Sequence, residues 1–486
     1  MFENSNNPRI IPFIELKPRI FRNPLPQAGE GPGERVTLAG QTLIKLIGRR
    51  VRIGRDSIII FVVTLLLFSI SIIQNSYYGH ESSLILFAQD IAHRGLQVFP
   101  SIDGTFFPDQ PNTPATLLYL SYAPIGSVSR FSVIFPSACC SALTLVLIYL
   151  IAAPHSRKWG FCAVLFALFT YFFTFSARSV GIQPYLMLIV TLCFYLAYAK
   201  DLYLFSINRG WLIALCSLGF VLCGPLGFIL PALITLNYYL LARRWLDLAM
   251  FAAMAVIFFT ILCGIYLYCA FLTGGNVLVQ QVLSAVLRGN ILYSNPHSIL
   301  YYCSHSLTWY ALSYPVAILV LLGSLPKLAR LQYDKRMRLL QCLATWAIIV
   351  LVIYSLQPYK NLQLVLPMVP ACALIAGYLF VDDEQTAWLA VFRRIFAFIL
   401  FVTPFIAAVV CSIARNIAKH RLHENFHAQY IYLLVILVIL QLVAIAYGLA
   451  RHSDRKDSMG LLVATLSFMA VFILVVEPAL LLKTSL

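Results

Sequence analysis

The feature that most constrains this chain is a series of apolar runs that recurs from residue 57 to residue 482. A helix needs about 20 mostly apolar residues to cross the hydrocarbon core of a bilayer, and a helix satisfies its own backbone groups there. The sequence therefore predicts an all-α polytopic membrane protein with about 13 transmembrane helices. The predicted runs are 57–75, 132–153, 159–176, 184–203, 210–222, 226–241, 248–272, 303–323, 339–356, 361–380, 391–414, 428–449 and 459–482.

Composition supports a membrane protein and argues against other classes. Of the 486 residues, 60% are hydrophobic and 11% charged, whereas soluble domains have about 45–50% apolar and about 25% charged residues. The net charge of +16 comes from Lys and Arg in short connections, without a basic patch interleaved with stacking aromatics, so we expect no nucleic acid partner. The 12 Cys lie mostly within apolar runs and have no zinc-ligand spacing, which favours a packing role.

Charge placement predicts the orientation of the spans. If the N-terminus is cytoplasmic, most of the 35 Lys and Arg residues fall in the N-terminal tail and in the even-numbered connections, as the positive-inside rule requires. The chain is then N-in/C-out, and the long connections 76–131 and 273–302 lie outside. Long loops held by a rigid scaffold commonly carry function. We expect 1–55 to be a disordered basic cytoplasmic tail, 56–380 to be the functional transmembrane module, and 381–486 to add three C-terminal transmembrane helices.

The first outer loop begins with a helix pattern. Ser82 to Arg94 places apolar residues on one face and polar residues on the other, and Gly95 follows as a stop signal. This predicts an amphipathic juxtamembrane helix at the membrane interface. Glu81 falls at its N-terminus, where the helix dipole favours a carboxylate, so Glu81 is either a helix-start residue or part of a site.

The same loop carries a family resemblance. From Gly79 the chain reads GHESSLILFAQDIAHRGLQVFPSIDGTFFPDQPNTPATLLYL. It resembles the first periplasmic loop of the glycosyltransferase C (GT-C) superfamily, closest to the protein O-mannosyltransferase and lipid A aminoarabinose transferase group. Their Asp-Glu pair is His80-Glu81 here, the Lys of their KGP segment is Cys223, and an Asp expected near the fourth span is Gln183. Further resembling segments extend the likeness over about 57–380: SARSVGIQPYLMLIVTLCFYLAY, LCGPLGFILPALI, LVQQVLSAVLRGN and YKNLQLVLPMVPACALIAGY.

The resemblance implies a glycosyltransferase in the bacterial inner membrane with its active site facing the periplasm. By that likeness, an inverting enzyme transfers a sugar from a polyprenyl-phosphate donor to a lipid (lipid A-like or another glycolipid) or protein acceptor, among membrane lipids. A base must take the acceptor's proton, cations must hold the leaving phosphate, and an apolar groove must accept the prenyl chain.

The candidate residues follow from these needs. Glu81 is the expected base, and His80 could serve instead because His titrates near neutral pH. Asp109 would orient the acceptor or bind a divalent metal, the one possible cofactor, although a turn residue fits PDQP as well. The residues expected to contact the phosphate or the substrate are Arg178, Arg288, Lys360, His297 and Tyr302, for which snorkelling and interfacial anchoring are the alternatives.

Two other function classes remain open. A secondary transporter or flippase usually carries ionisable groups near the membrane midplane on broken helices. The predicted spans are nearly free of such groups, and CGPLG is one candidate break without a partner. Because His80 replaces an acidic residue, the chain could also be an inactive GT-C-like partner subunit.

Overall fold

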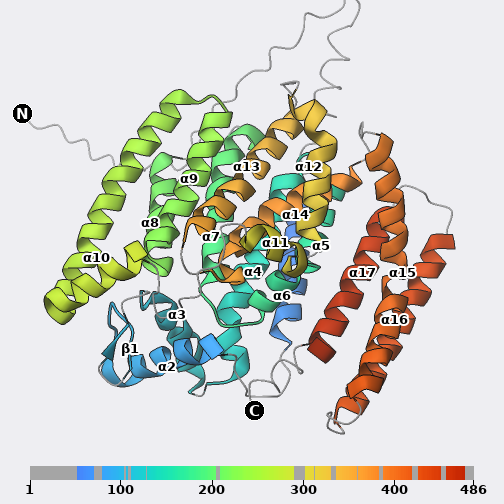
Figure 1. The fold of residues 1–486 in the computed structure, drawn as a ribbon, viewed down its shortest axis with the longest axis horizontal. Helices are drawn as coiled ribbons and strands as arrows, with labels where there is room; N and C mark the ends of the chain where they lie inside the picture. The colour runs from blue at the N-terminus through green and yellow to red at the C-terminus, as the bar shows by residue number, and fades with distance from the viewer. Residues whose placement is uncertain are drawn as a thin grey trace, which may run out of the picture.

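The structure, a computed structural model, is almost entirely helical where it is described (Figure 1). It describes residues 52–70, 79–102, 105–107, 111–126, 128–203, 208–288, 301–310, 312–329, 335–357, 360–381, 387–418, 425–449 and 456–476.

A small layer follows the first helix, residues 52–69, and lies at one end of the helix bundle (Figure 1). Its two strands pair antiparallel, with Ser101 opposite Phe106 and Ile102 opposite Thr105. Its elements are α2 (Gly79–Arg94), β1 (Ser101–Ile102), β2 (Thr105–Phe106), α3 (Thr113–Tyr122) and the 3-10 turn η1 (Ala123–Ile125).

The bundle itself is built from long apolar helices. Its first part comprises α4 (Arg130–Ala152), α5 (Arg157–Leu168), α6 (Tyr171–Ala177), α7 (Gln183–Tyr203), α8 (Arg209–Cys223), α9 (Pro225–Leu241) and α10 (Trp245–Arg288). Its second part comprises α11 (Tyr301–Trp309), α12 (Ser313–Ala329), α13 (Lys335–Leu356), η3 (Leu362–Met368), α14 (Val369–Gly377), η4 (Tyr378–Phe380), α15 (Ala387–Ala418), α16 (Asn425–Leu449), α17 (Lys456–Val471) and η6 (Phe472–Val476).

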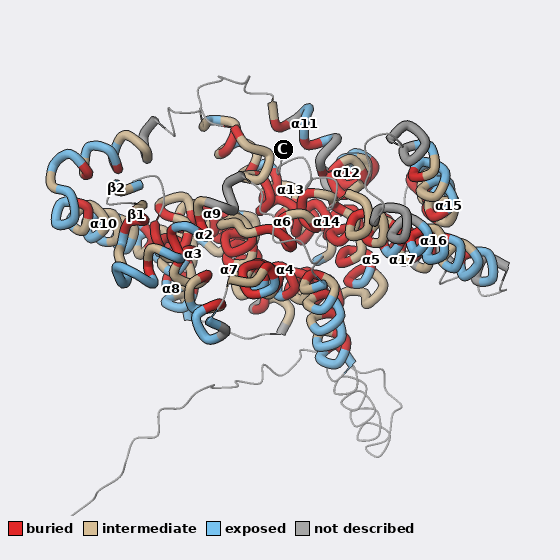
Figure 2. Tube along the Cα trace, turned by 90° about the horizontal axis from the view of Figure 1, so that it is seen from below, coloured by how far each residue is buried: buried red, intermediate tan, exposed pale blue. Residues whose placement is uncertain are grey.

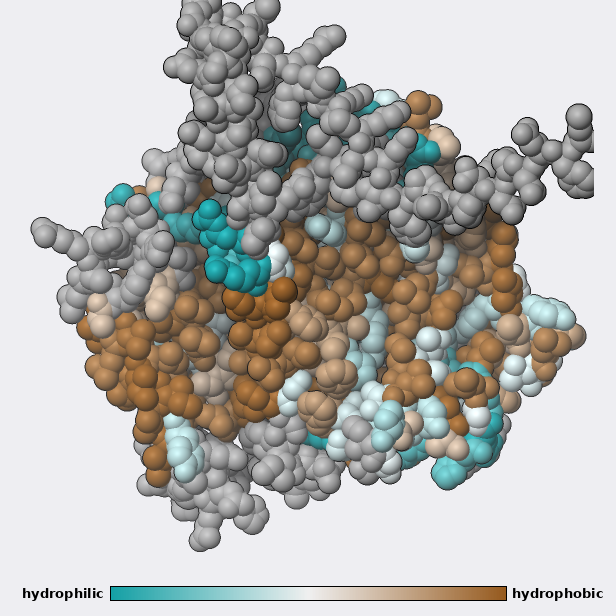
Figure 3. Space-filling model, turned by 180° about the vertical axis from the view of Figure 1, so that it is seen from behind, coloured by the Kyte–Doolittle hydropathy of each residue, from teal (hydrophilic) through white to brown (hydrophobic). Residues whose placement is uncertain are grey.

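The predicted helical membrane fold is confirmed. Within the described ranges, 6 helices are long and apolar enough to cross a membrane, or 7 if the bent pair α5 and α6 is one span. Shorter apolar helices within α7, α8, α9, α12 and α16 add to these. Hydrophobic side chains form a broad band across the middle of one face, with hydrophilic residues gathered toward the ends of the helices (Figure 3).

Local sequence determines where the helices begin and bend. The Ser129 side chain accepts a hydrogen bond from the Ser132 backbone at 3.2 Å and caps α4. Gly224 has φ of 72° and separates α8 from α9, a backbone conformation open to glycine. Gly274 and Gly275 leave helical geometry inside α10, so its last turns leave the direction of the span.

The core lies between α4, α5, α7, α13 and α14, where α14 is buried along its whole length. Two buried tryptophans bond to backbone carbonyls in this core. The Trp159 indole N–H donates to the Leu374 oxygen at 2.7 Å, and the Trp346 indole N–H donates to the Pro367 oxygen at 3.1 Å. Each apolar ring thereby buries its polar atom with a partner.

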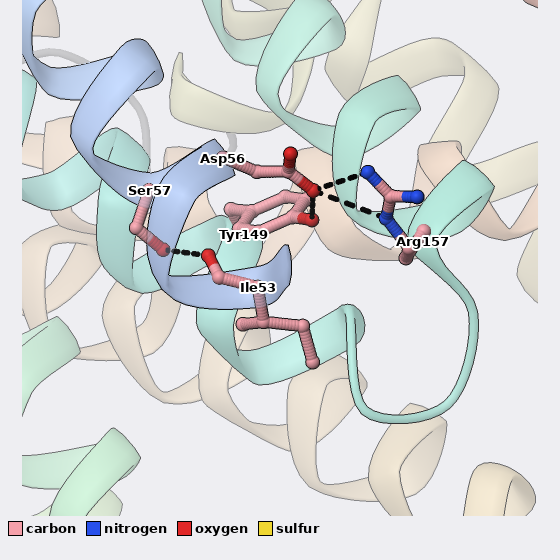
Figure 4. A network of polar contacts seen from close by, with 5 residues as sticks. All are labelled: Ile53, Asp56, Ser57, Tyr149 and Arg157. Atoms are coloured by element: carbon pink, nitrogen blue, oxygen red, sulfur yellow. Dashed lines mark hydrogen bonds and ion pairs between the residues drawn. The ribbon is translucent and has the colours of Figure 1, made fainter. Parts of the chain in front are cut away.

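One end of the bundle, which we call the inner end because the sequence predicts it to be cytoplasmic, carries paired charges. Asp56 accepts hydrogen bonds from the Tyr149 hydroxyl at 2.6 Å and from Arg157 Nη2 at 2.6 Å and Nε at 3.0 Å (Figure 4). Asp201 accepts in the same way from Tyr238 and Arg244.

A third ion pair joins Arg209 of α8 to Asp247 of α10. Three of the predicted inner cations, Arg157, Arg244 and Arg209, are thus paired with carboxylates. Asp56–Arg157 and Arg209–Asp247 join the ends of two helices, and Asp201–Arg244 joins the end of α7 to the residue before α10. The opposite end of the bundle, with α2 and α3, is called the outer end.

Helices α8 and α9 approach each other closely at two glycines. A Cβ atom added to Gly219 would lie 2.1 Å from the Gly227 carbonyl oxygen, and one added to Gly227 would lie 2.0 Å from the Gly219 oxygen. Real Cβ atoms do not tolerate such distances, so both positions require glycine for packing.

We predict that Gly219→Ala lowers the apparent melting temperature of the detergent-purified protein, because overpacking typically costs about 1–3 kcal/mol. Gly264→Ala is the matched control, since a Cβ there meets nothing within 4 Å and alanine favours helix. Equal melting temperatures for the two variants would contradict the close packing of α8 on α9.

Candidate functional site at the outer end

The outer layer is held together by the apolar face of α2. This face packs against α3, and the Tyr122 hydroxyl donates to the Ala88 carbonyl at 2.8 Å. Burial raises the pKa of the Tyr122 phenol above its ordinary value, and nearby Tyr119 adds to the rise, so the hydroxyl keeps its proton. The amphipathic helix expected at 82–94 is present. The apolar cluster contains Leu84, Ile85, Phe87, Ala88, Ile91, Ala115, Leu118, Tyr122 and Val133.

Helix α2 begins at Gly79, so His80 and Glu81 occupy its first turn. Their side chains lie outside the described residues. Arg288 is the last residue of α10, and its side chain is also outside them, as are the whole of Asp109 and His297. The roles of these residues therefore stay predictions.

The segment after α2 is organised by short polar contacts. Gly95 has φ of 82° and ends the helix, as its stop signal predicted. The Ser101 hydroxyl lies 2.7 Å from Asp90 Oδ2, and the Asn112 amide Nδ2 donates to the Gln97 carbonyl at 3.1 Å. These bonds hold the loop between α2 and α3 to helix α2 and close the loop on itself.

An apolar pocket opens beside this loop, with a volume of about 450 Å³. Its walls come from the loop and the start of α3, from the end of α8 and from the outer half of α10. No residue of this pocket was among the sequence candidates, because its walls come from three separate segments. The lining residues are Leu96, Gln97, Val98, Pro111, Thr113, Thr116, Phe220, Val221, Leu262, Ile265, Tyr266 and Cys269.

Arg178, predicted to hold phosphate, caps the first helix in this structure, and its predicted role in phosphate binding stays a prediction. It follows α6, is only 3% exposed, and donates to the carbonyl oxygens of Leu67 at 2.8 Å, Phe68 at 3.3 Å and Ile70. A cation at a helix C-terminus satisfies its orphan carbonyls and its dipole. Arg178 therefore fixes the point where the chain leaves the first helix toward His80 and Glu81.

Lys360 and Tyr302 do lie together, as a shared substrate site would require. The Lys360 ammonium is 5.9 Å from the centre of the Tyr302 ring and donates to the Ser355 carbonyl at 2.9 Å. The Tyr302 side chain is fully buried, and its hydroxyl accepts from the Asn361 N–H at 3.0 Å. Lys360, 8% exposed, thus sits at the end of α13 over an aromatic ring.

Two positions where the resemblance places charged residues are neutral and adjacent. Cys223 ends α8, and its Sγ lies 3.9 Å from the carbonyl of Ile182, the residue before Gln183. Cys223 and Gln183 each stand where the resemblance leads us to expect a charged residue, so each replacement removes one charge from this region. Neither replacement leaves an unpaired charge.

Among the described residues, no group of three or more His, Cys, Asp or Glu is arranged to hold a metal ion. Asp109, the candidate for a divalent metal, is outside those residues, so this expectation stays a prediction.

Comparisons with known proteins agree with the predicted resemblance. No family model matches the chain. The chain is 29% identical over 195 residues to an undecaprenyl phosphate-alpha-4-amino-4-deoxy-L-arabinose arabinosyl transferase of Pseudomonas savastanoi pv. phaseolicola, a match that spans 38% of this chain and 35% of that relative.

The fold is similar to crystal structures of ArnT from Cupriavidus metallidurans. The structure bound to undecaprenyl phosphate has a TM-score of 0.64 and covers 89% of this chain and 78% of that one. The apo structure has a TM-score of 0.62, with coverages of 90% and 79%. Both are 16% identical to this chain, so they show the fold. The resemblance to the aminoarabinose transferase group is confirmed.

The capping role of Arg178 predicts that Arg178→Gln lowers the apparent melting temperature of the purified protein, because hydrogen bonds to charged groups contribute roughly 1.5–3 kcal/mol each. Arg94→Gln is the control, since Arg94 is an exposed arginine whose ion pair with Asp90 spans 3.1 Å and such pairs contribute about 0–1 kcal/mol. The capping role is wrong if thermal unfolding does not distinguish the two variants.

Proposed function

We propose that this chain is a membrane glycosyltransferase that takes a sugar from an undecaprenyl-phosphate-linked donor and works at the outer face of the bacterial inner membrane. The observation that carries the proposal is the ArnT-like fold over 89% of the chain, together with the sequence match to an arabinosyl transferase. Since the relative from Pseudomonas savastanoi is named as a 4-amino-4-deoxy-L-arabinose arabinosyl transferase, we favour that sugar over mannose, and a lipid A-like acceptor.

The proposed topology has thirteen membrane passes with the N-terminus inside. The described helices that support it are helix 52–69, the bent pair α5 and α6, and the apolar helices α4, α7 to α10, α12, α13, η3 to η4, and α15 to α17. The paired inner end supports this orientation, because basic connections meet there. Figures 1 and 2 show α15, α16 and α17 side by side at one edge, in agreement with a catalytic module over 56–380 and three added helices, and we propose no structure for tail 1–55.

The proposed chemistry is a single displacement. An acceptor oxygen forms a bond to the anomeric carbon while the bond from that carbon to the phosphate oxygen breaks, and the configuration inverts. Glu81, or His80 beside it, takes the acceptor's proton, and undecaprenyl phosphate leaves with the bonding electrons. Asp109 is the residue proposed to orient the acceptor.

The leaving phosphate needs a cation, and Lys360 is the best candidate among the residues that the structure describes. Its ammonium lies between the end of α13 and the Tyr302 ring, so it is already positioned within the outer half of the fold. Arg178 supports the site indirectly through the first helix, while Arg288 and His297 remain proposed contacts from the second outer loop.

Transport is the second candidate function, and the broken span formed by α5 and α6 is the described feature that favours it. Transporters place ionisable groups near the membrane midplane. The described carboxylates that join bundle helices, Asp56, Asp201 and Asp247, all lie at the inner end and are all paired with arginines. A role as an inactive partner subunit is tested by the same assay as the transferase activity.

The assay incubates purified protein with undecaprenyl-phosphate sugars and lipid acceptors and measures sugar transfer. We predict that Glu81→Gln reduces kcat about 10²- to 10⁴-fold, the usual contribution of a general base, and that His80→Ala shows whether His80 assists. Asp90→Asn is the control, because Asp90 lies on the same helix but is bonded to Ser101. Transfer that survives both changes at positions 80 and 81 removes them from the site.

Lys360→Met should raise the KM for the donor by roughly tenfold or more while leaving the KM for the acceptor unchanged, because a charge-assisted bond to phosphate is worth about 1.5–3 kcal/mol. Initial rates at varied donor concentration measure this. A donor KM equal to that of the unmodified protein would place the phosphate elsewhere.

A further inference from the structure

Tyr302, near the start of α11, and Tyr310, just after its end, bond to the backbone that follows Lys360. The Tyr302 hydroxyl accepts from the Asn361 N–H at 3.0 Å and donates to the Asn361 carbonyl oxygen at 3.2 Å. The Tyr310 hydroxyl donates to the Leu362 carbonyl oxygen at 2.6 Å. The backbone of both residues after Lys360 is therefore held by a phenol hydroxyl.

Tyr310 also attaches this backbone to the broken span. Its ring stacks on Phe172 of α6, with the ring centres 5.4 Å apart and an angle of 15° between the ring planes. Ser313, at the start of α12, accepts a hydrogen bond at 2.8 Å from the hydroxyl of Thr170, which lies at the bend between α5 and α6. The Tyr310 side chain is fully buried, so it can affect a substrate only through the groups that it contacts.

Lys360 lies where such support matters. It stands between the end of α13 and the start of η3, outside both helices. Its ammonium donates to the Ser355 carbonyl at 2.9 Å and lies 5.9 Å from the centre of the Tyr302 ring. A lysine side chain has many rotamers, and a cation that is already oriented loses less freedom when it binds phosphate. The position of the Lys360 backbone therefore decides where the cation stands.

Helix α6 also relates Lys360 to the proposed base. Phe172 of this helix stacks on Tyr310. Arg178, directly after the helix, caps the end of the first helix, from which the chain leads on to Glu81. A single displacement needs the base on one side of the anomeric carbon and the phosphate cation on the other, and misplacing a group by about 1 Å can cost roughly 10²-fold in rate. One short helix thus supports both sides of the proposed reaction.

We propose that Tyr310 is a positioning residue for the donor: its hydroxyl and ring hold the backbone after Lys360 against α6 and so place the ammonium for the donor phosphate. The inference rests on the proposed function, in which Lys360 binds that phosphate, and adds to it a residue that does not touch the substrate. Tyr310 was not among the sequence candidates, because its partners Leu362 and Phe172 lie far from it in the chain.

The test removes one oxygen atom. Tyr310→Phe keeps the ring and its stacking on Phe172 but loses the bond to Leu362. The donor KM in the transfer assay should therefore rise about 3- to 10-fold, the effect of one buried hydrogen bond, while the acceptor KM stays unchanged. Phe172→Leu, which removes the stacked ring from the other side, should also raise the donor KM and serves if Tyr310→Phe fails to fold. An unchanged donor KM in either folded variant overturns the proposal.

A double-mutant cycle with Lys360 distinguishes positioning from general support of the fold. When Lys360→Met is already present, adding Tyr310→Phe should leave the donor KM unchanged, because the cation that Tyr310 positions is gone. A structural role would instead raise the donor KM by the same factor with and without Lys360, and that result overturns the proposal.

The matched control removes an equally buried hydroxyl at the other end of the bundle. Tyr238 is fully buried and donates to Asp201 at the inner end, so Tyr238→Phe should leave the donor KM unchanged. A rise equal to that of Tyr310→Phe would assign the effect to a loss of packing and overturn the proposal.

A binding measurement separates this inference from the function it rests on. The dissociation constant of undecaprenyl phosphate, measured with the purified protein in detergent, should follow the same pattern in the unmodified protein, the two single variants and the double variant. If no donor gives transfer but the constants show this coupling, the proposed function fails and the positioning role stands. If transfer occurs but the two changes act independently, the function stands and the positioning role is wrong. Absence of binding to the unmodified protein overturns both.

Discussion

The outer end of this protein depends on how one broken span holds the first helix. The pair α5 and α6 bends by 76°, and an arginine stands at each of its ends. Arg157 begins α5 and binds Asp56 near the start of helix 52–69, whereas Arg178 follows α6 and caps the carbonyls at its end. The bent pair therefore sets the height of the first helix in the bundle, and with it the point from which the chain proceeds to Gly79, His80 and Glu81.

Charged side chains at the inner end of the bundle are also paired across helices. A charge is costly in hydrocarbon unless it is paired, and three inner carboxylates each meet an arginine from another helix. In two of these groups a tyrosine hydroxyl also donates to the carboxylate. The polar contacts that join helix ends thus lie at the inner end, while the outer end carries the small layer of α2 and α3 and an apolar pocket.

The sequence predicted the features that depend on repeated or local residue patterns. The apolar runs predicted the helical bundle, and the spacing of apolar residues after Ser82 predicted α2 with its stop at Gly95. The sequence could not reveal the capping contacts of Arg178, because that residue's carbonyl partners lie 108 to 111 positions earlier in the chain. The pocket was beyond prediction for the same reason, since Leu96, Val221 and Ile265 meet only in the folded bundle. The bend between α5 and α6 could not be predicted either, because the connecting residues Phe169 and Thr170 include no Pro or Gly.

The central claim is that this fold transfers a lipid-linked sugar at the outer face of the membrane. The most direct measurement places the protein in sealed right-side-out membrane vesicles with an undecaprenyl-phosphate sugar and lipid A, and treats the product with a membrane-impermeant oxidant of sugars. The account predicts that sugar is transferred and that the newly attached sugar is oxidised. A product that is protected until the vesicles are opened, or no product from the unmodified protein, would contradict it.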